Sequence, residues 1–207
     1  MPAFPLQTSG IQPSLFADDD LLLPEGMKFV ENFLSSADEA RWLDVVRGIE
    51  THVVRYKQYM AKRRSAAFGG RFDYDTNTLR EAPPIPPALE PLRAQVADWL
   101  GVEPQRFTQL LVAEYRPGTP LGWHRDAPDF ESIVGVSLGG PALMRLRPYP
   151  PPANDPKAVR HLQLPPRSAY VLEGPARWAW QHSIAETPGL RYSLSLRTAR
   201  GTPRLLG

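Results

Sequence analysis

The chain has 207 residues, of which 42% are hydrophobic and 22% are charged. This length suits one domain with a single sizeable core, and the composition is ordinary for a soluble globular protein. The absence of cysteine excludes disulfides, thiolate metal sites and a cysteine nucleophile. A formal net charge of +2 is too small to indicate nucleic-acid binding by itself. Because the sequence shows neither a signal-peptide pattern nor an apolar run of about 20 residues, we expect a cytoplasmic protein that does not cross a membrane.

The first half of the chain predicts two helices. Residues 1–25 show no sustained period and are expected to form an irregular arm, after which residues 26–207 are expected to form a single domain. Ser36 and Glu39 match a capping box and predict an amphipathic helix over residues 37–50. A second helix is expected to open at Pro87 and to stop at Gly101.

From residue 107 onward the chain changes to short apolar stretches separated by glycine or proline. These stretches predict strands at 107–116, 133–138, 142–147, 168–172, 178–184 and 192–198. A further strand is expected before the helices, at 27–33. Two helices followed by a run of short strands indicate the α+β class. We expect a double-stranded β-helix, or jelly-roll, core over residues 107–200, with the N-terminal helices packed on one sheet.

The histidines carry the first chemical signal. His124 and Asp126 are two residues apart in a stretch expected to be extended, so both side chains can point the same way. His182 follows near the end of another predicted strand. Two imidazoles and one carboxylate on one face of iron(II) form the triad of non-haem iron oxygenases, which leaves open positions for a co-substrate and O₂. The alternative is a surface pair of His124 and Asp126 with an unrelated strand histidine.

The last predicted strand carries the second signal. Arg191, Ser193, Ser195 and Arg197 would lie on one face, with Leu194 and Leu196 on the other. An arginine fork suits carboxylate recognition, as a chelating dicarboxylate co-substrate would require. The alternative is an exposed strand face with solvated arginines.

Several ordered motifs between Glu114 and Arg197 resemble the AlkB family of 2-oxoglutarate-dependent nucleic-acid dealkylases. They are Tyr115-Arg-Pro-Gly118, Leu121, His124-Arg-Asp126, Val134-Gly-Val-Ser-Leu-Gly139, Asn154-Asp-Pro156, His182-Ser-Ile184 and Arg191-Tyr-Ser-Leu-Ser-Leu-Arg197. A looser similarity covers residues 29–49 and 71–87.

The resemblance implies a role for each matching residue. His124, Asp126 and His182 would hold Fe(II). Arg191 and the Tyr115 hydroxyl would bind the distal carboxylate of 2-oxoglutarate, and Arg197 would lie near its metal-bound end.

This chain also departs from the family pattern. Ala113 and Ser193 stand where asparagine is frequent, although Ser193 can still donate a hydrogen bond to the co-substrate. Pro128 replaces an acidic residue that can touch the substrate base, and the neighbouring Asp129 is the candidate to substitute for it.

Residues 51–86 correspond to the nucleotide-recognition lid of that family. The stretch 55–80 interleaves basic and aromatic side chains, which can follow a phosphate backbone and stack on an unpaired base. Our candidates for substrate contact are Phe68, Arg71, Phe72 and Tyr74. The alternative is a solvated basic loop whose aromatic side chains pack into the core.

The resulting hypothesis is a monomeric Fe(II)- and 2-oxoglutarate-dependent dioxygenase. It would use O₂ to demethylate N-alkylated bases in single-stranded or flipped-base DNA or RNA, as in alkylation repair, and would release succinate, CO₂ and formaldehyde. The alternatives are a hydroxylase of protein or small molecules on the same scaffold, a non-catalytic nucleic-acid-binding module, and a cupin-like isomerase or hydrolase. The arginine pair disfavours the last of these.

Overall fold

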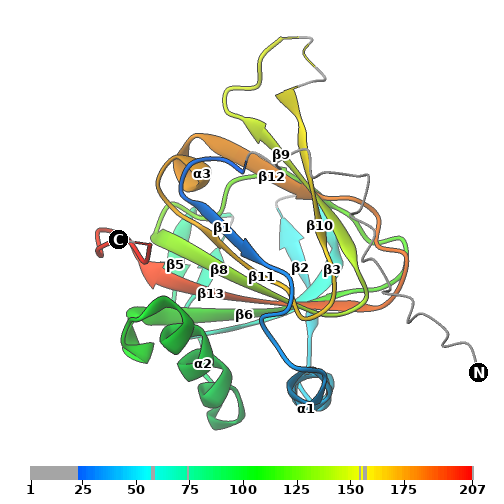
Figure 1. Cartoon of the computed structure of the whole chain (residues 1–207), viewed down its shortest axis with the longest axis vertical. Coiled ribbons are helices and arrows are strands. Elements are labelled where there is room, and N and C mark those ends of the chain that lie inside the picture. The colour runs from blue at the N-terminus through cyan, green and yellow to red at the C-terminus, as the bar shows by residue number, and fades with distance from the viewer. Residues whose placement is uncertain (1–22, 57–58, 74, 154, 156–157, 207) are drawn as a thin grey trace, which may run out of the picture.

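Two β-sheets packed face to face form the centre of the protein in the computed structural model (Figure 1). The structure describes residues 23–56, 59–73, 75–153, 155 and 158–206. Most of the predicted arm, Tyr74, and Asn154 and Pro156 of the Asn154–Pro156 motif therefore lie outside the described residues. None of the described helices is long and apolar enough to cross a membrane.

The larger sheet has seven strands in the order β1-β11-β8-β13-β6-β3-β2. Their bounds are Met27–Val30 (β1), His52–Tyr56 (β2), Tyr59–Phe68 (β3), Phe107–Tyr115 (β6), Phe130–Gly139 (β8), Ala169–Leu172 (β11) and Arg191–Ala199 (β13). All neighbouring strands run antiparallel. The central position of β13, between β6 and β8, places its side chains in the middle of the molecule.

The smaller sheet has four strands in the order β10-β9-β12-β7. They span Leu121–His124 (β7), Ala142–Pro148 (β9), Arg160–Leu164 (β10) and Trp180–Ile184 (β12). A separate hairpin pairs Arg71–Asp73 (β4) with Thr78–Arg80 (β5). The two facing sheets have the jelly-roll architecture expected from the sequence.

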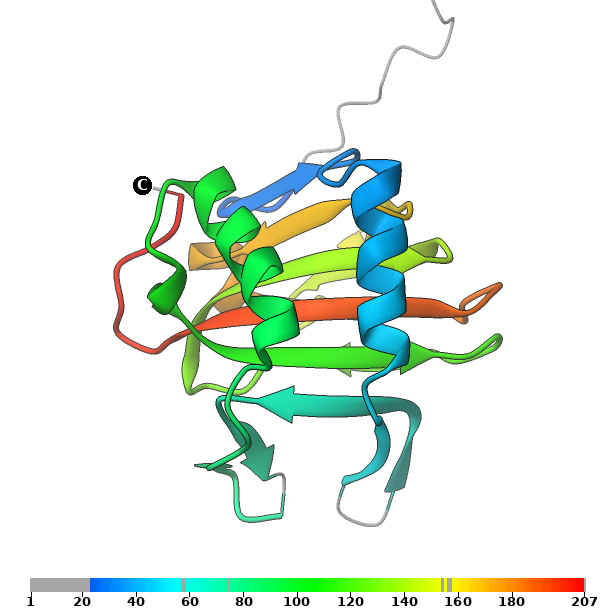
Figure 2. The same ribbon diagram turned by 90° about the horizontal axis from the view of Figure 1, so that it is seen from below.

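Two helices cover the outer face of the larger sheet, as Figure 2 shows. They are α1 (Ser36–Arg47) and α2 (Glu90–Leu100), and short 3₁₀ turns at Pro87–Leu89 (η1) and Pro104–Arg106 (η2) flank α2. Trp42 and Val46 of α1 and Leu92 and Val96 of α2 are buried against alternate residues of β8 and β13, including Leu194. Strand alternation turns the other residues of these strands toward the smaller sheet, where a second apolar cluster forms.

The helix boundaries differ slightly from the predicted ones. The N-cap of α1 is Ser35 rather than Ser36, because the Ser35 hydroxyl accepts the Asp38 amide and reaches its carboxylate. Glu39 is thereby released from capping, and its carboxylate accepts the Gly139 amide across the α1–β8 contact. The helix ends at Arg47, before residue 50. Gly101 does end α2 in the left-handed conformation, as predicted.

Two strand predictions also need correction. The strand at 27–33 stops at Val30. The stretch 178–184 begins in a short helix, α3 (Gly174–Trp178), because Pro175 occupies its first turn and suits a helix start. The described part of the predicted lid segment 51–86 contains four strands, which the sequence analysis did not predict. Strand β3 pairs with β6 and β2 pairs with β3, so both extend the larger sheet.

Candidate metal centre and adjoining pockets

Strands β7 and β12 bring three candidate ligands together. His124 ends β7, Asp126 follows it, and His182 lies directly opposite His124 in the antiparallel register. Their ligand atoms all lie within 4.8 Å of one another, and the two imidazole centroids are 4.2 Å apart. The Nε2 atom of His182 is 3.5 Å from an Asp126 carboxylate oxygen. The structure therefore brings His182 together with His124 and Asp126, although it follows Asp126 by 56 positions in the sequence, and the three form one potential metal site.

Hydrogen bonds orient two of these ligands. The Nδ1 atom of His124 lies 2.9 Å from the Gly122 carbonyl, so Nδ1–H donates and Nε2 keeps its lone pair for a metal. Arg197 donates two bonds to the same Asp126 oxygen, at 2.7 and 3.2 Å, and a third to Gln109 at 2.7 Å. One carboxylate oxygen is thus held by Arg197 while the other faces His182.

The electrostatics keep all three groups in the state that binds metal. Burial raises the pKa of Asp126, but the Arg197 guanidinium and both imidazoles outweigh burial and hold that pKa well below its usual range. Burial, together with the neighbouring His124, lowers the pKa of His182 to about 3, against the opposing pull of Asp126. Burial also lowers the pKa of His124, against the opposing pull of Asp126. Near neutral pH the centre has one carboxylate and two neutral imidazoles.

A buried arginine that the sequence reading missed supports the ligand loop. Arg177, only 3% exposed, donates to the carbonyls of Asp126, Ala127 and Phe130 at 3.1, 2.6 and 3.1 Å. These bonds hold the segment between β7 and β8 in place. An arginine within a short helix carries no local sequence signal for this role, because its partners lie about 50 residues away.

The same loop explains where Asp129 lies. It is not among the residues that line the pockets at the metal centre. The turn closes with a bond from the Phe130 amide to the Ala127 carbonyl, and the Asp129 carbonyl accepts the Arg200 amide. The loop is therefore tied toward the end of β13. The expected substitution of Asp129 for the acidic residue at Pro128 finds no support in this arrangement.

A small cavity of about 30 Å³ lies between the sheets beside the three ligands. Arg191, Ser193, Ser195 and Arg197 all line it, as the alternation of β13 predicts, together with Tyr115. Arg191 is 1% exposed and donates from Nε to the Ser137 hydroxyl at 3.1 Å, while its guanidinium lies 5.0 Å from the Tyr115 ring. Among the described residues, its buried Nη1 finds no hydrogen-bond partner. A buried cationic donor without an acceptor fits the carboxylate of a co-substrate.

Tyr170 is a further cavity residue that the sequence reading missed. Burial raises its pKa to about 12, so its phenol is a neutral donor at ordinary pH. Its ring lies over Gly135, where a Cβ would come within 2.2 Å of the ring. A side chain at position 135 would collide with the Tyr170 ring, which explains why this position of the Val134–Gly139 motif is glycine. Arg63 of β3 also lines the cavity and donates to the Tyr115 hydroxyl at 3.3 Å.

A large open groove of about 1380 Å³ adjoins the cavity. His124 and Asp126 lie along it, and so do three of the four substrate residues predicted in the lid, Phe68, Arg71 and Phe72. Phe68 also packs against the core. It therefore lines the groove, as predicted for substrate contact, and packs into the core, as the alternative for the lid aromatic residues predicted. The fourth predicted residue, Tyr74, is outside the described part of the chain.

Comparison with known proteins agrees with this geometry. Residues 26–201 match the family model described as the 2OG-Fe(II) oxygenase superfamily. A mouse protein named tRNA (carboxymethyluridine(34)-5-O)-methyltransferase ALKBH8 is 30% identical over 169 residues, which cover 78% of this chain and 24% of the mouse protein. An Arabidopsis thaliana protein named alkylated DNA repair protein ALKBH8 homolog is 29% identical over 199 residues, covering 86% of this chain and 56% of the relative. The chain thus spans about a quarter of the first relative and about half of the second.

Solved structures show the same fold. The structure titled OsALKBH1 aligns with a TM-score of 0.61 at 16% identity, covering 84% of this chain and 98% of that one. A Pseudomonas putida prolyl-4-hydroxylase aligns with a TM-score of 0.52 at 16% identity, covering 84% and 93%. With its matched family model, its sequence relatives and a His-Asp-His centre suited to Fe(II) and 2-oxoglutarate, the chain belongs to the 2OG-Fe(II) oxygenase superfamily and is an AlkB-family dioxygenase.

Proposed function

We propose that this dioxygenase removes methyl groups from N-methylated bases in single-stranded or locally unpaired DNA or RNA. The observation that carries the proposal is the groove beside the metal centre. Its volume of about 1380 Å³ leaves room for a base, and it combines aromatic side chains with arginines, Phe68 and Phe72 with Arg63 and Arg71. Aromatic faces stack on unpaired bases and arginines attract phosphates, so this lining suits a nucleotide.

The residues around the centre fit Fe(II) and 2-oxoglutarate. His124, Asp126 and His182 would hold the metal, with the Arg197 bonds keeping the aspartate in place. The unpartnered Nη1 of Arg191 would bind the distal carboxylate of the co-substrate, and the Tyr115 and Ser193 hydroxyls line the same cavity. When bound, iron and 2-oxoglutarate supply the activation of O₂, with conversion of 2-oxoglutarate to succinate and CO₂ and insertion of one oxygen atom into a C–H bond.

Each pocket then has a separate task. The small cavity between the sheets would take the co-substrate, because the buried Arg191 and Arg197 line it. The groove positions the N-methyl group over His124 and Asp126. Hydroxylation of that methyl group gives an unstable N-hydroxymethyl base, which loses formaldehyde and restores the N–H bond.

The names of the relatives support a nucleic-acid substrate of either type. The mouse protein is named for a uridine in tRNA and the Arabidopsis protein for alkylated DNA. The substrate panel should therefore include both polymers. Our proposal concerns the oxygenase region alone, because the chain covers about a quarter of the mouse protein.

The test is incubation of the full chain with Fe(II), ascorbate and 2-oxoglutarate. The substrates are single-stranded DNA, single-stranded RNA and tRNA carrying N-methylated bases. Mass spectrometry should show loss of one methylene mass per base, with equimolar succinate and formaldehyde. A preparation that converts 2-oxoglutarate to succinate but leaves every methylated polymer unchanged would exclude this function and would favour a hydroxylase of protein or small molecules. The matching prolyl hydroxylase folds are consistent with that rival.

A further inference from the structure

A row of arginines lies on the outer face of the smaller sheet. Met144 and Leu146 of β9 are buried between the sheets, so strand alternation places Arg145 and Arg147 on the opposite, outer face. Each is braced by the neighbouring strand β12. Arg145 donates to Ser183 at 3.0 Å, and Arg147 donates twice to the side-chain oxygen of Gln181 at 2.8 and 3.0 Å.

Aromatic rings hold these guanidinium groups in position. Trp123 of β7 lies 4.3 Å from the Arg147 guanidinium and 5.3 Å from that of Arg145. Arg125 lies 4.0 Å over the ring of Tyr149, which is 43% exposed. We name these five residues, Trp123, Arg125, Arg145, Arg147 and Tyr149, the basic-aromatic strip. Stacked guanidinium groups are ordered before binding, so less entropy is lost when their free N–H edges meet a ligand.

The arginines of the strip lack ion-pair partners among the residues that the structure describes. Within the described part of the chain, none of its three arginines forms an ion pair with a carboxylate. Other surface arginines do have such partners, including Arg41 with Asp38 and Arg116 with Glu114. Three fixed positive charges without an ion-pair partner among the described residues, in a chain whose formal net charge is only +2, suit the binding of a polyanion.

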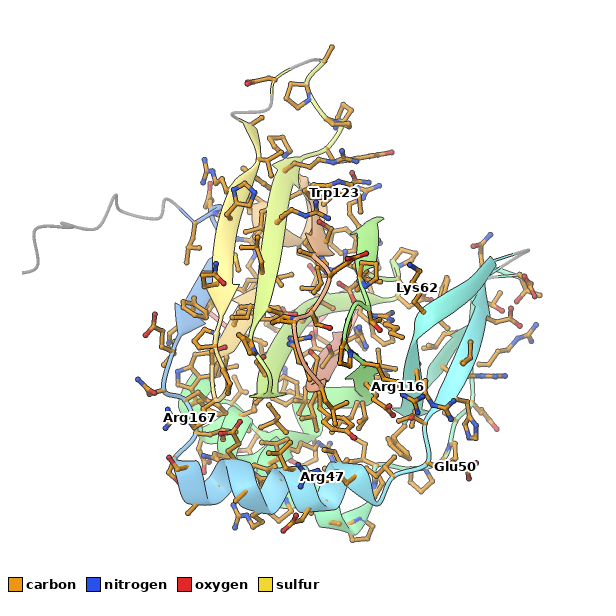
Figure 3. The ribbon with its side chains drawn as sticks, turned by 90° about the vertical axis from the view of Figure 1, so that its right-hand side faces the viewer. Arg47, Glu50, Lys62, Arg116, Trp123 and Arg167 are labelled. Atoms are coloured by element: carbon orange, nitrogen blue, oxygen red, sulfur yellow. The ribbon has the colours of Figure 1, made fainter. Side chains whose placement is uncertain are left out.

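The strip is continuous with the groove at the metal centre. Trp123 and Arg125 flank His124 in the chain and line the groove themselves. Figure 3 shows Trp123 on the side of the smaller sheet, far from Arg47 on helix α1 and on the same half of the molecule as Lys62 of β3. A polymer whose target unit lies in the groove can therefore continue over Trp123 onto β9 without crossing the larger sheet.

We infer that the basic-aromatic strip binds the sugar-phosphate backbone of the nucleic-acid strand that flanks the target nucleotide. This inference rests on the proposed function for the choice of polymer. It adds a second binding surface outside the predicted lid, on the opposite sheet. The arginines contact phosphates, and the exposed ring of Tyr149 offers a stacking face for a neighbouring base.

Binding of unmodified single-stranded oligonucleotides tests the strip directly, because it requires no demethylation. Fluorescence anisotropy would compare the parent with the double variant Arg145→Gln and Arg147→Gln over a series of salt concentrations. The control is Arg41→Ala with Arg47→Ala, which removes the same charge from α1. We expect the strip variant to bind at least about tenfold more weakly, with a salt slope shallower by about 1.4 for two lost phosphate contacts on a single strand. The control should bind like the parent.

Cross-linking of the parent protein provides a measurement that needs no variant. A photoreactive oligonucleotide should give adducts within residues 121–125 and 145–149. Unchanged affinity and salt slope in the folded strip variant, or adducts confined to other segments, would refute the inference. So would binding of poly-glutamate without binding of oligonucleotide. If demethylation fails while oligonucleotides still bind through the strip, only the proposed function is refuted. If demethylation succeeds and oligonucleotide affinity does not depend on Arg145 and Arg147, only the inference about the strip is refuted.

Discussion

Replacement of Arg191 by methionine separates co-substrate binding from folding. In the free protein this guanidinium is buried and donates to Ser137, while Nη1 has no hydrogen-bond partner among the described residues. Burial lowers its pKa, which is the signature of a charge that the fold tolerates at a cost. An apolar side chain of similar length should therefore leave the stability of the free protein unchanged or raise it.

The same change should severely weaken binding of 2-oxoglutarate. Removing one partner of a buried, hydrogen-bonded charge pair costs about 2–5 kcal/mol, because the other charge stays desolvated and unpaired. At about 1.4 kcal/mol per tenfold, the dissociation constant should rise by a factor of roughly 30 to 4000. Arg191→Lys should fall between the parent and the methionine variant, because lysine keeps the charge but lacks the planar fork.

Anaerobic calorimetric titration of the Fe(II)-loaded protein with 2-oxoglutarate measures this loss, and thermal unfolding without metal or co-substrate measures stability. Arg177→Met is the matched control, since Arg177 is also buried but donates to three backbone carbonyls. We expect the control to lower the unfolding temperature. If Arg191→Met unfolds at a much lower temperature while a folded fraction binds 2-oxoglutarate as tightly as the parent does, Arg191 is a structural residue and the reasoning is wrong.

Three further predictions concern the metal, the groove and pH. Alanine at His124, Asp126 or His182 should each abolish iron-dependent succinate formation in a folded chain, and full activity in any one variant contradicts the ligand set. Phe72→Ala should lower the ratio of demethylated base to succinate, measured by mass spectrometry, because the groove residue acts on the primary substrate; an unchanged ratio argues for another entry path. Burial raises the pKa of Tyr170 to about 12 from an ordinary 10. Its contribution to the free energy of unfolding is therefore fully present below pH 10 and is lost as pH rises toward 12, by up to about 1.4 kcal/mol per pH unit. Urea unfolding at pH 9 to 11 should therefore show a shallower decline for Tyr170→Phe than for the parent, and equal declines would show that the phenol is not buried as described.

Local patterns in the sequence predict much of the architecture. The stop of α2 at Gly101 follows from the left-handed conformation that glycine adopts without strain. The two faces of β13 follow from the period of two, with Leu194 in the helix-facing core and Arg191 lining the cavity. The helix start differs by one residue from the predicted one because both Ser35 and Ser36 can cap, and in the structure Ser35 caps while Glu39 accepts the distant Gly139 amide.

The tertiary structure alone decided which distant residues act together. The position of His182 opposite His124 depends on the pairing of β12 with β7, a long-range register that no local pattern encodes. Arg177, Tyr170 and Arg63 enter the site through contacts with segments 35 or more residues away, and nothing in their own neighbourhoods distinguishes them from surface residues. A sequence period determines which face of an element a side chain occupies. What that face meets is set by sheet pairing and packing, which depend on the free energy of the whole fold.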